Sequence, residues 1–185
     1  GLPDGTSAIA FEDWPPIYVA IECKAAAGSL YLGNPTKKES RGWHLNQRNW
    51  YQDYALPLGM PYFVATFVTP ERKPSRIDYA KASMFLVPPL AWLELEAEAA
   101  NFGTRTVALC LGNAKNRAQR NAHLTLMDYW RPFLLPYSKQ SFSIPKDHPF
   151  WYAFSRFRAA ARTSATAPIE AHTYAAATQP GLALQ

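Results

Sequence analysis

The chain is poor in cysteine and has no long apolar run. Its two cysteines, Cys23 and Cys110, have no second Cys or His at the spacing of a zinc ligand set, so neither a zinc site nor a disulfide framework is predicted. No apolar run reaches the roughly 18 residues of a membrane span, and nothing resembles a secretory leader. These absences predict a soluble, intracellular protein of a cytoplasmic, reducing compartment, with no membrane partner.

The composition allows one globular domain with material left for an extension. Hydrophobic residues make up 48% of the 185 positions, and 19 Lys and Arg exceed 14 Asp and Glu to give a net charge of +5. A basic surplus favours a polyanionic partner, although scattered surface charge explains it equally well. The chain begins at Gly1 rather than Met, and we expect native sequence in front of it.

The hydrophobic pattern predicts an α/β core, with a mixed central β-sheet flanked by helices over residues 1–100. Residues 101–158 form an extension of uncertain fold, within which a strand at 106–111 and a helix at 115–130 are expected. Residues 159–185 are rich in Ala and Thr and predict a flexible tail. The expected core order is strand 6–12, strand 17–24, helix 40–55, strand 62–68, strand 83–87 and helix 90–100.

Alternation along the second strand separates two kinds of side chain. In a strand, side chains two positions apart share a face. One face is apolar and suits a core, whereas the other brings a carboxylate and an amine side by side. The first face carries Ile17, Val19, Ile21 and Cys23, and the second carries Tyr18, Ala20, Glu22 and Lys24.

The helix expected at 40–55 has an aromatic stripe that contains one amide. Its stripe consists of Trp43, Trp50, Tyr51 and Tyr54, with Gln47 inside it. A second, basic face is formed by residues three and four positions apart, namely Arg41, His44 and Arg48.

Hydrolysis of a phosphodiester needs a metal-activated water and neutralisation of charge on the phosphate. Magnesium takes oxygen ligands and keeps several waters, so two carboxylates and one carbonyl suffice to hold it. Asp4 and Glu22 fit this role if the hairpin brings them together, with the backbone carbonyl of Cys23 as a further ligand. Lys24 can orient the water or stabilise the developing charge.

These residues resemble the motif of a known nuclease superfamily. Pro3-Asp4, 17 intervening residues and then Glu22-Cys23-Lys24 at the end of an apolar strand are similar to the PD-(D/E)XK nucleases. The resemblance implies a restriction-endonuclease-like core in which Asp4 and Glu22 bind Mg²⁺, with Mn²⁺ as a substitute, and Lys24 assists catalysis.

The glutamine on the next helix is similar to one branch of that superfamily. Gln47 followed by strand 62–68 resembles the Holliday-junction resolvases (RecU-like and archaeal) and related phage nucleases, which implies a catalytic role for Gln47, a homodimer and branched DNA as substrate. Two features depart from that branch. The chain shows no upstream helix with a glutamate, and Asn46 rather than His precedes Gln47.

Several residues have a plain structural explanation beside the functional one. Asp13 is a rival first carboxylate, but a turn beside two prolines explains it. The basic residues can form solvated surface or contact phosphates. The DNA-binding candidates are Lys37, Lys38, Arg41, His44 and Arg48, and a weaker cluster consists of Lys115, Arg117 and Arg120.

The sequence therefore predicts a metal-dependent DNA endonuclease, a phosphodiester hydrolase that acts on recombination or repair intermediates such as Holliday junctions. Two alternatives stay open. One is a restriction-type or repair nuclease with sequence or end specificity, and the other is a non-catalytic DNA-binding protein that keeps the nuclease fold.

Overall fold

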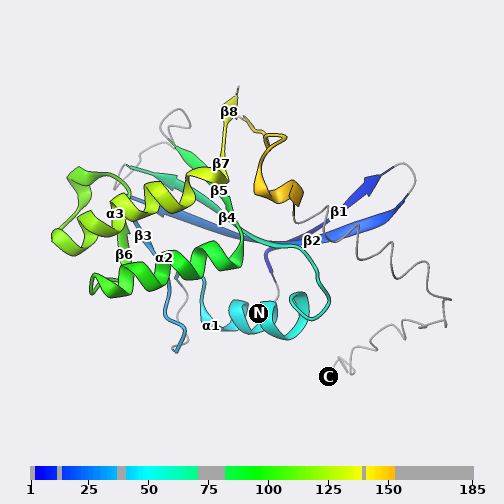
Figure 1. Ribbon diagram of the computed structural model, residues 1–185, viewed down its shortest axis with the longest axis horizontal. Helices are drawn as coiled ribbons and strands as arrows, with labels where there is room; N and C mark the ends of the chain where they lie inside the picture. The colour runs from blue at the N-terminus through cyan, green and yellow to red at the C-terminus, as the bar shows by residue number, and fades with distance from the viewer. Residues whose placement is uncertain (1–2, 12–13, 37–40, 71–81, 139–140, 153–185) are drawn as a thin grey trace, which may run out of the picture.

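The computed structural model describes residues 3–11, 14–36, 41–70, 82–138 and 141–152. Its centre is a five-stranded mixed sheet with the strand order β1-β2-β4-β5-β7 (Figure 1). Strands β2 and β4 run parallel, and the other neighbours in this sheet are antiparallel. The strands are β1 (Gly5–Phe11), β2 (Trp14–Ala27), β4 (Tyr62–Thr69), β5 (Ser83–Val87) and β7 (Leu134–Leu135).

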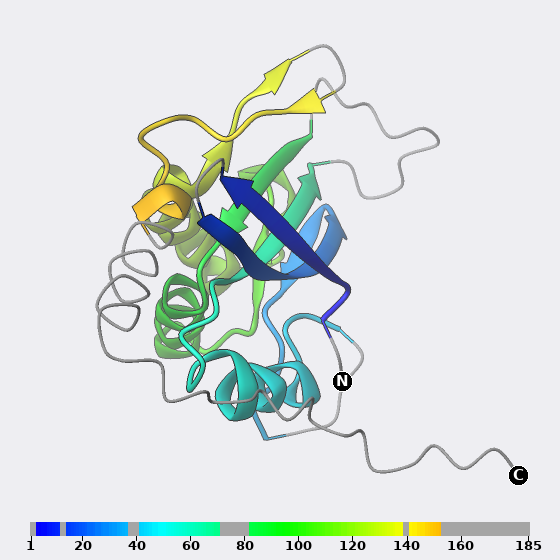
Figure 2. The same cartoon turned by 90° about the vertical axis from the view of Figure 1, so that its right-hand side faces the viewer.

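Helices cover one face of this sheet, which confirms the predicted α/β class with a mixed central sheet. Figures 1 and 2 show these helices gathered on the same side of the strands. They are α1 (Leu45–Trp50), which continues into the π-helical turn η1 (Tyr51–Ala55), α2 (Pro89–Asn101) and α3 (Arg117–Trp130). Among the described residues, no helix has the length and apolar character to cross a membrane.

The hydrophobic core has two parts, one on each face of the sheet. On the helix-covered face, Trp92 of α2 and Trp130 of α3 lie with ring centroids 5.2 Å apart and pack onto β4 and β5. On the opposite face, Phe63 packs against Phe150 from the C-terminal part of the described chain. Segments beyond residue 100 thus contribute to both parts of the core.

The predicted alternation along β2 agrees with the structure over the middle of the strand, where both faces are buried, but Cys23, which was expected on the core face, is exposed. Ile17 and Val19 belong to the part of the core on the face opposite the helices, whereas Ala20 belongs to the part on the helix-covered face. Glu22 pairs in register with Val64 of β4 and is completely buried. The carboxylate therefore lies at the edge of the helix-covered core and not on a solvated face.

Smaller elements complete the chain. Strand β3 (Ser29–Tyr31), which the sequence pattern did not predict, pairs antiparallel with β6 (Thr106–Ala108), so the strand expected at 106–111 is shorter. A 3-10 turn η3 (Leu111–Asn113) leads toward α3, and η4 (Arg131–Phe133) follows it. Strands β8 (Tyr137–Ser138) and β9 (Ser141–Phe142) form a second small hairpin sheet.

The helix expected at 40–55 begins later than predicted, at Leu45. Gly42 has φ +67°, and a Cβ there would lie 2.5 Å from the backbone nitrogen of Gly33, so this point of the chain is closely packed and not helical. His44 is extended and caps the helix. Trp43 is therefore buried in the core ahead of the helix and is not part of a helical stripe.

Candidate active site

The hairpin of β1 and β2 brings Asp4 opposite Glu22. Gly5 pairs with Ile21, so the next pair outward in this antiparallel ladder is Asp4 with Glu22. The Asp4 carboxylate accepts a hydrogen bond from the Cys23 backbone N–H at 2.8 Å through Oδ2. The register of the hairpin thus brings Asp4 close to Glu22, which the sequence alone could not establish.

Glu22 is held through one of its two carboxylate oxygens. The Lys24 ammonium donates to Glu22 Oε1 at 2.7 Å, and the amide of Gln47 donates a short hydrogen bond to the same oxygen. Alternation on β2 places Lys24 beside Glu22, and α1 places Gln47 over both. The structure therefore brings together Asp4, Glu22, Lys24 and Gln47, the four predicted catalytic residues.

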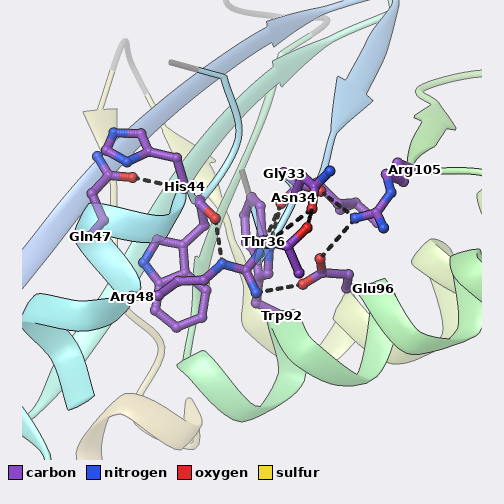
Figure 3. Close-up of polar contacts among 11 residues, drawn as sticks. Gly33, Asn34, Thr36, His44, Gln47, Arg48, Trp92, Glu96 and Arg105 are labelled. Carbon is purple, nitrogen blue, oxygen red and sulfur yellow. Dashed lines mark hydrogen bonds and ion pairs between the residues drawn. The ribbon is translucent and has the colours of Figure 1, made fainter. Parts of the chain in front are cut away.

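The start of α1 fixes which way the Gln47 amide points. Gln47 is almost completely buried, and its Oε1 accepts a hydrogen bond from the His44 backbone N–H at 3.2 Å. Figure 3 shows this bond closing over the first helical turn. Because the amide oxygen is engaged there, the amide nitrogen is the group left to face Glu22.

The main electrostatic feature of the cluster is the burial of the Glu22 carboxyl, whereas Asp4 is exposed. Burial raises the pKa of the Glu22 carboxyl above its ordinary value; the hydrogen bond and charge of Lys24 oppose this rise, and the hydrogen bond and charge of Asp4 add to it. Burial and the charges of Asp4 and Glu22 also raise the pKa of the Cys23 thiol. Two carboxylates this close are relieved by a shared cation.

The second oxygen of Glu22 fits a metal ligand. Glu22 Oε2 is buried and receives no hydrogen bond from any described residue, whereas Oε1 receives two. The Cys23 N–H points toward Asp4, and the carbonyl of a strand residue points to the same side as its N–H, so the Cys23 carbonyl is available there as well. Within the described residues no group of three His, Cys, Asp or Glu side chains gathers, so any ion here would rely on two carboxylates, a carbonyl and water.

Arg48 does not lie on the exposed basic face that its spacing predicts. It is buried, and its guanidinium pairs with Glu96 of α2 at 2.7 Å and donates to the Trp43 carbonyl at 2.6 Å. Figure 3 shows this chain of contacts continuing from Glu96 to Arg105. Because the helix begins at Leu45, Arg41 and His44 lie outside it and do not share a helical face with Arg48, which faces α2 instead. There it holds α1 against α2 and thereby helps to position Gln47.

Glu96, the partner of Arg48, was not predicted from the sequence as part of the surroundings of Gln47. A signal was present, because Glu96 falls on the inward stripe of α2 with Trp92, Leu95 and Ala99, where an acidic side chain needs a cationic partner.

The other predicted contact residues are placed differently from one another. Arg41 is exposed and its guanidinium lies 5.2 Å from the centre of the Tyr31 ring. His44 is half-buried, and burial together with the charge of Lys24 lowers its pKa. Lys37, Lys38 and the rival carboxylate Asp13 lie outside the described residues.

Comparison with known proteins adds no relative. No family model, no curated protein and no solved structure matches this chain. The functional argument therefore rests on the cluster itself.

Proposed function

We propose that the chain is a metal-dependent DNA endonuclease of the PD-(D/E)XK kind. The observation that carries the proposal is the asymmetry of Glu22, whose Oε1 is held by Lys24 and Gln47 while its buried Oε2 receives no hydrogen bond from any described residue. A structural Glu-Lys pair on a strand explains the first contact. The structural pair of Glu96 and Arg48 also leaves one buried oxygen without a donor, so the support for a metal site at Glu22 comes from its free oxygen together with the second carboxylate, Asp4, and Lys24.

The order of elements supports the same proposal. The aspartate precedes β1, the Glu-x-Lys lies on the antiparallel neighbour β2, and β4 returns parallel to β2 after the helix that carries Gln47. This order is similar to the one expected of a restriction-endonuclease-like core, and it supports the proposal because it brings the four residues together.

The residues divide the chemistry among them. Asp4, Glu22 and the Cys23 carbonyl would hold Mg²⁺ or Mn²⁺, which when bound supplies a water of lowered pKa and neutralises charge on the phosphate. Lys24 keeps a positive charge next to the position of the scissile phosphate, where it orients the attacking water or stabilises the extra negative charge of the transition state. Gln47 positions Glu22. Attack by water breaks the P–O bond, and the leaving oxygen takes up a proton.

Branched DNA is the substrate that we propose first, because Gln47 on the helix after β2 is the feature shared with the resolvase branch. The test is incubation with four-way junction, linear duplex and single-stranded DNA in Mg²⁺, Mn²⁺ or EDTA. Paired, symmetric nicks in the junction are expected with either metal and none with EDTA.

The matched variants are Lys24→Ala and Lys146→Ala, since Lys146 is an exposed lysine away from the cluster. Lys24→Ala should lose cleavage, and Lys146→Ala should keep it. Cleavage of duplex ends or of one sequence would select a repair or restriction-type enzyme. If no substrate is cut with either metal, or if Lys24→Ala cuts like the parent, the nuclease proposal is wrong.

A further inference from the structure

A groove of about 870 Å³ adjoins the candidate active site. It shares Cys23 and Lys24 with that site and continues along residues 25–31 to the chain before α3. Its walls come from segments far apart in the sequence, including Arg41, Lys115 and Gln119. Lys115 belongs to the cluster that the sequence made a weak candidate, and the fold places it in one groove with the catalytic lysine.

The charges along this groove are of one sign. Lys24, Arg41 and Lys115 line it, and none of its described lining residues is acidic. Contacts within the chain help to position two of these residues, Arg41 and Lys115. The Arg41 guanidinium lies over the Tyr31 ring, and the Lys115 backbone N–H donates to the Gln119 side chain at 2.9 Å, next to the Asn116 cap of α3. Lys24 pairs with Glu22, but Arg41 and Lys115 have no acidic partner among the described residues, so this part of the groove favours a polyanion.

The floor of the groove is an edge of β2 that pairs with no described strand. From residue 22 onward β2 has β4 as its pairing partner among the described residues, because the ladder with β1 ends at Gly5 and Ile21. The backbone N–H groups of Ala20 and Gly28 donate toward the β4 side, so those of Ala25 and Ala27 point the opposite way, as that of Cys23 does. Both alanines line the groove and offer N–H donors without bulky side chains.

We propose that this groove binds the backbone of one nucleic-acid strand next to the scissile phosphate, with Arg41 and Lys115 each contacting a phosphate. The inference rests on the proposed nuclease function. Cations and backbone N–H groups are the groups that contact phosphates, and they carry no base information. The alanine floor has no side chain that can read base edges, and the lining amides of Asn113 and Gln119 are already bonded to the backbone of Pro70 and Lys115, so we expect binding through the groove to be independent of sequence. A free strand edge also accepts an extended peptide, but the row of cations that leads to Lys24 favours a nucleic acid.

The test compares two double variants with the same change in charge. Arg41→Gln with Lys115→Gln removes the two groove cations, whereas Arg131→Gln with Lys146→Gln removes two exposed cations that do not line the groove. Binding of labelled single-stranded, duplex and four-way DNA is measured in Ca²⁺ over a range of salt concentrations. Unfolding midpoints of both double variants are measured beside those of the parent.

The groove variant should bind at least one of these DNAs about tenfold more weakly, and the slope of log K against log salt should fall by about 1.4 to 1.8, as expected for two lost phosphate contacts. The control variant should keep the parental slope. If the groove variant is unfolded, Lys115→Gln alone should lower the slope by about 0.7 to 0.9.

The outcomes separate the two proposals. Suppose that the parent cuts DNA and that the groove variant binds DNA as tightly as the control variant does. This result would overturn the groove inference and leave the nuclease proposal standing. A parent that neither binds nor cuts any DNA would overturn both. Tight binding of a labelled polyglutamate peptide by the parent, lost in the groove variant while DNA binding is kept, would assign the groove to acidic peptides and overturn the inference.

Discussion

Gln47 and Glu22 are 25 positions apart in the chain, yet the amide of Gln47 donates to the carboxylate oxygen that Lys24 also contacts. The amide is oriented by its second bond, to the backbone of His44. The N-terminus of α1 and strand β2 are thus joined through one side chain. We therefore expect Gln47 to affect the rate of the proposed reaction.

Gln47→Ala should slow DNA cleavage by about tenfold, because it removes one buried hydrogen bond worth about 1–1.5 kcal/mol from the carboxylate that faces the proposed metal. The measurement is the single-turnover cleavage rate at saturating Mg²⁺. Gln52→Ala, on the exposed side of η1, is the matched control and should cleave like the parent. Equal rates for the two variants would show that Gln47 only caps its helix.

Arg48→Met should destabilise the protein by about 3 kcal/mol, because it leaves the buried Glu96 carboxylate with only the longer contact to Arg105 at 3.9 Å. The measurement is urea unfolding. Adding Glu96→Leu to this variant should restore much of the loss, since both charges are then gone. A loss of less than about 1 kcal/mol, the range of exposed ion pairs, would mean that Arg48 is solvated and available to DNA after all.

Stability should fall on mild acidification because of His44. Its pKa is lowered from 6.5 by burial and by the charge of Lys24. Between the lowered folded value and 6.5, the unfolded chain binds more protons than the folded one, so stability is present above this window and is lost as the pH falls through it. His44→Asn, which keeps a good capping residue, should flatten this dependence in unfolding curves recorded from about pH 5 to 8. An identical pH slope in parent and variant would contradict the assignment.

Magnesium should stabilise the folded protein. A ligand that binds only the folded state at ten times its Kd adds about 1.4 kcal/mol, which is measurable as a rise in the thermal midpoint. Asp4→Asn and Glu22→Gln should abolish the rise, and Asp53→Asn, an exposed control, should retain it. Without metal, Glu22→Gln should be at least as stable as the parent at neutral pH: the raised pKa of Glu22 means that its ionisation costs stability as the pH rises through the folded value.

The strand part of the site could be predicted from sequence because alternation is a local rule. It places Glu22 and Lys24 on one face whatever the rest of the chain does, and the short span from Asp4 limits the hairpin register. The α/β class followed from the same periodicities. Gln47 was also expected inward, and the structure buries it, although the helix begins five residues later than predicted.

What sequence could not give depends on tertiary packing. Helical spacing put Arg48 on a basic face with Arg41, but Gly42 packs against Gly33 and breaks the helix between them, and Glu96 then draws Arg48 inward. The groove likewise contains both Lys24 and Lys115. It lies along an edge of β2 that is left without β1 as a partner because β1 begins at Gly5. Such relations arise between elements and leave no periodic trace in one sequence.

The central claim is that the Glu22 oxygen left without a donor serves a metal-dependent hydrolytic site. Single-turnover cleavage of the preferred DNA in Mg²⁺ by Glu22→Gln, beside Glu94→Gln on the exposed side of α2, tests it most directly. The account predicts that Glu94→Gln cleaves at the parental rate and that Glu22→Gln, while folded, cleaves at least about 100-fold more slowly. In EDTA, neither variant nor the parent should cleave DNA. Parental cleavage by Glu22→Gln, or cleavage that persists in EDTA, would contradict it.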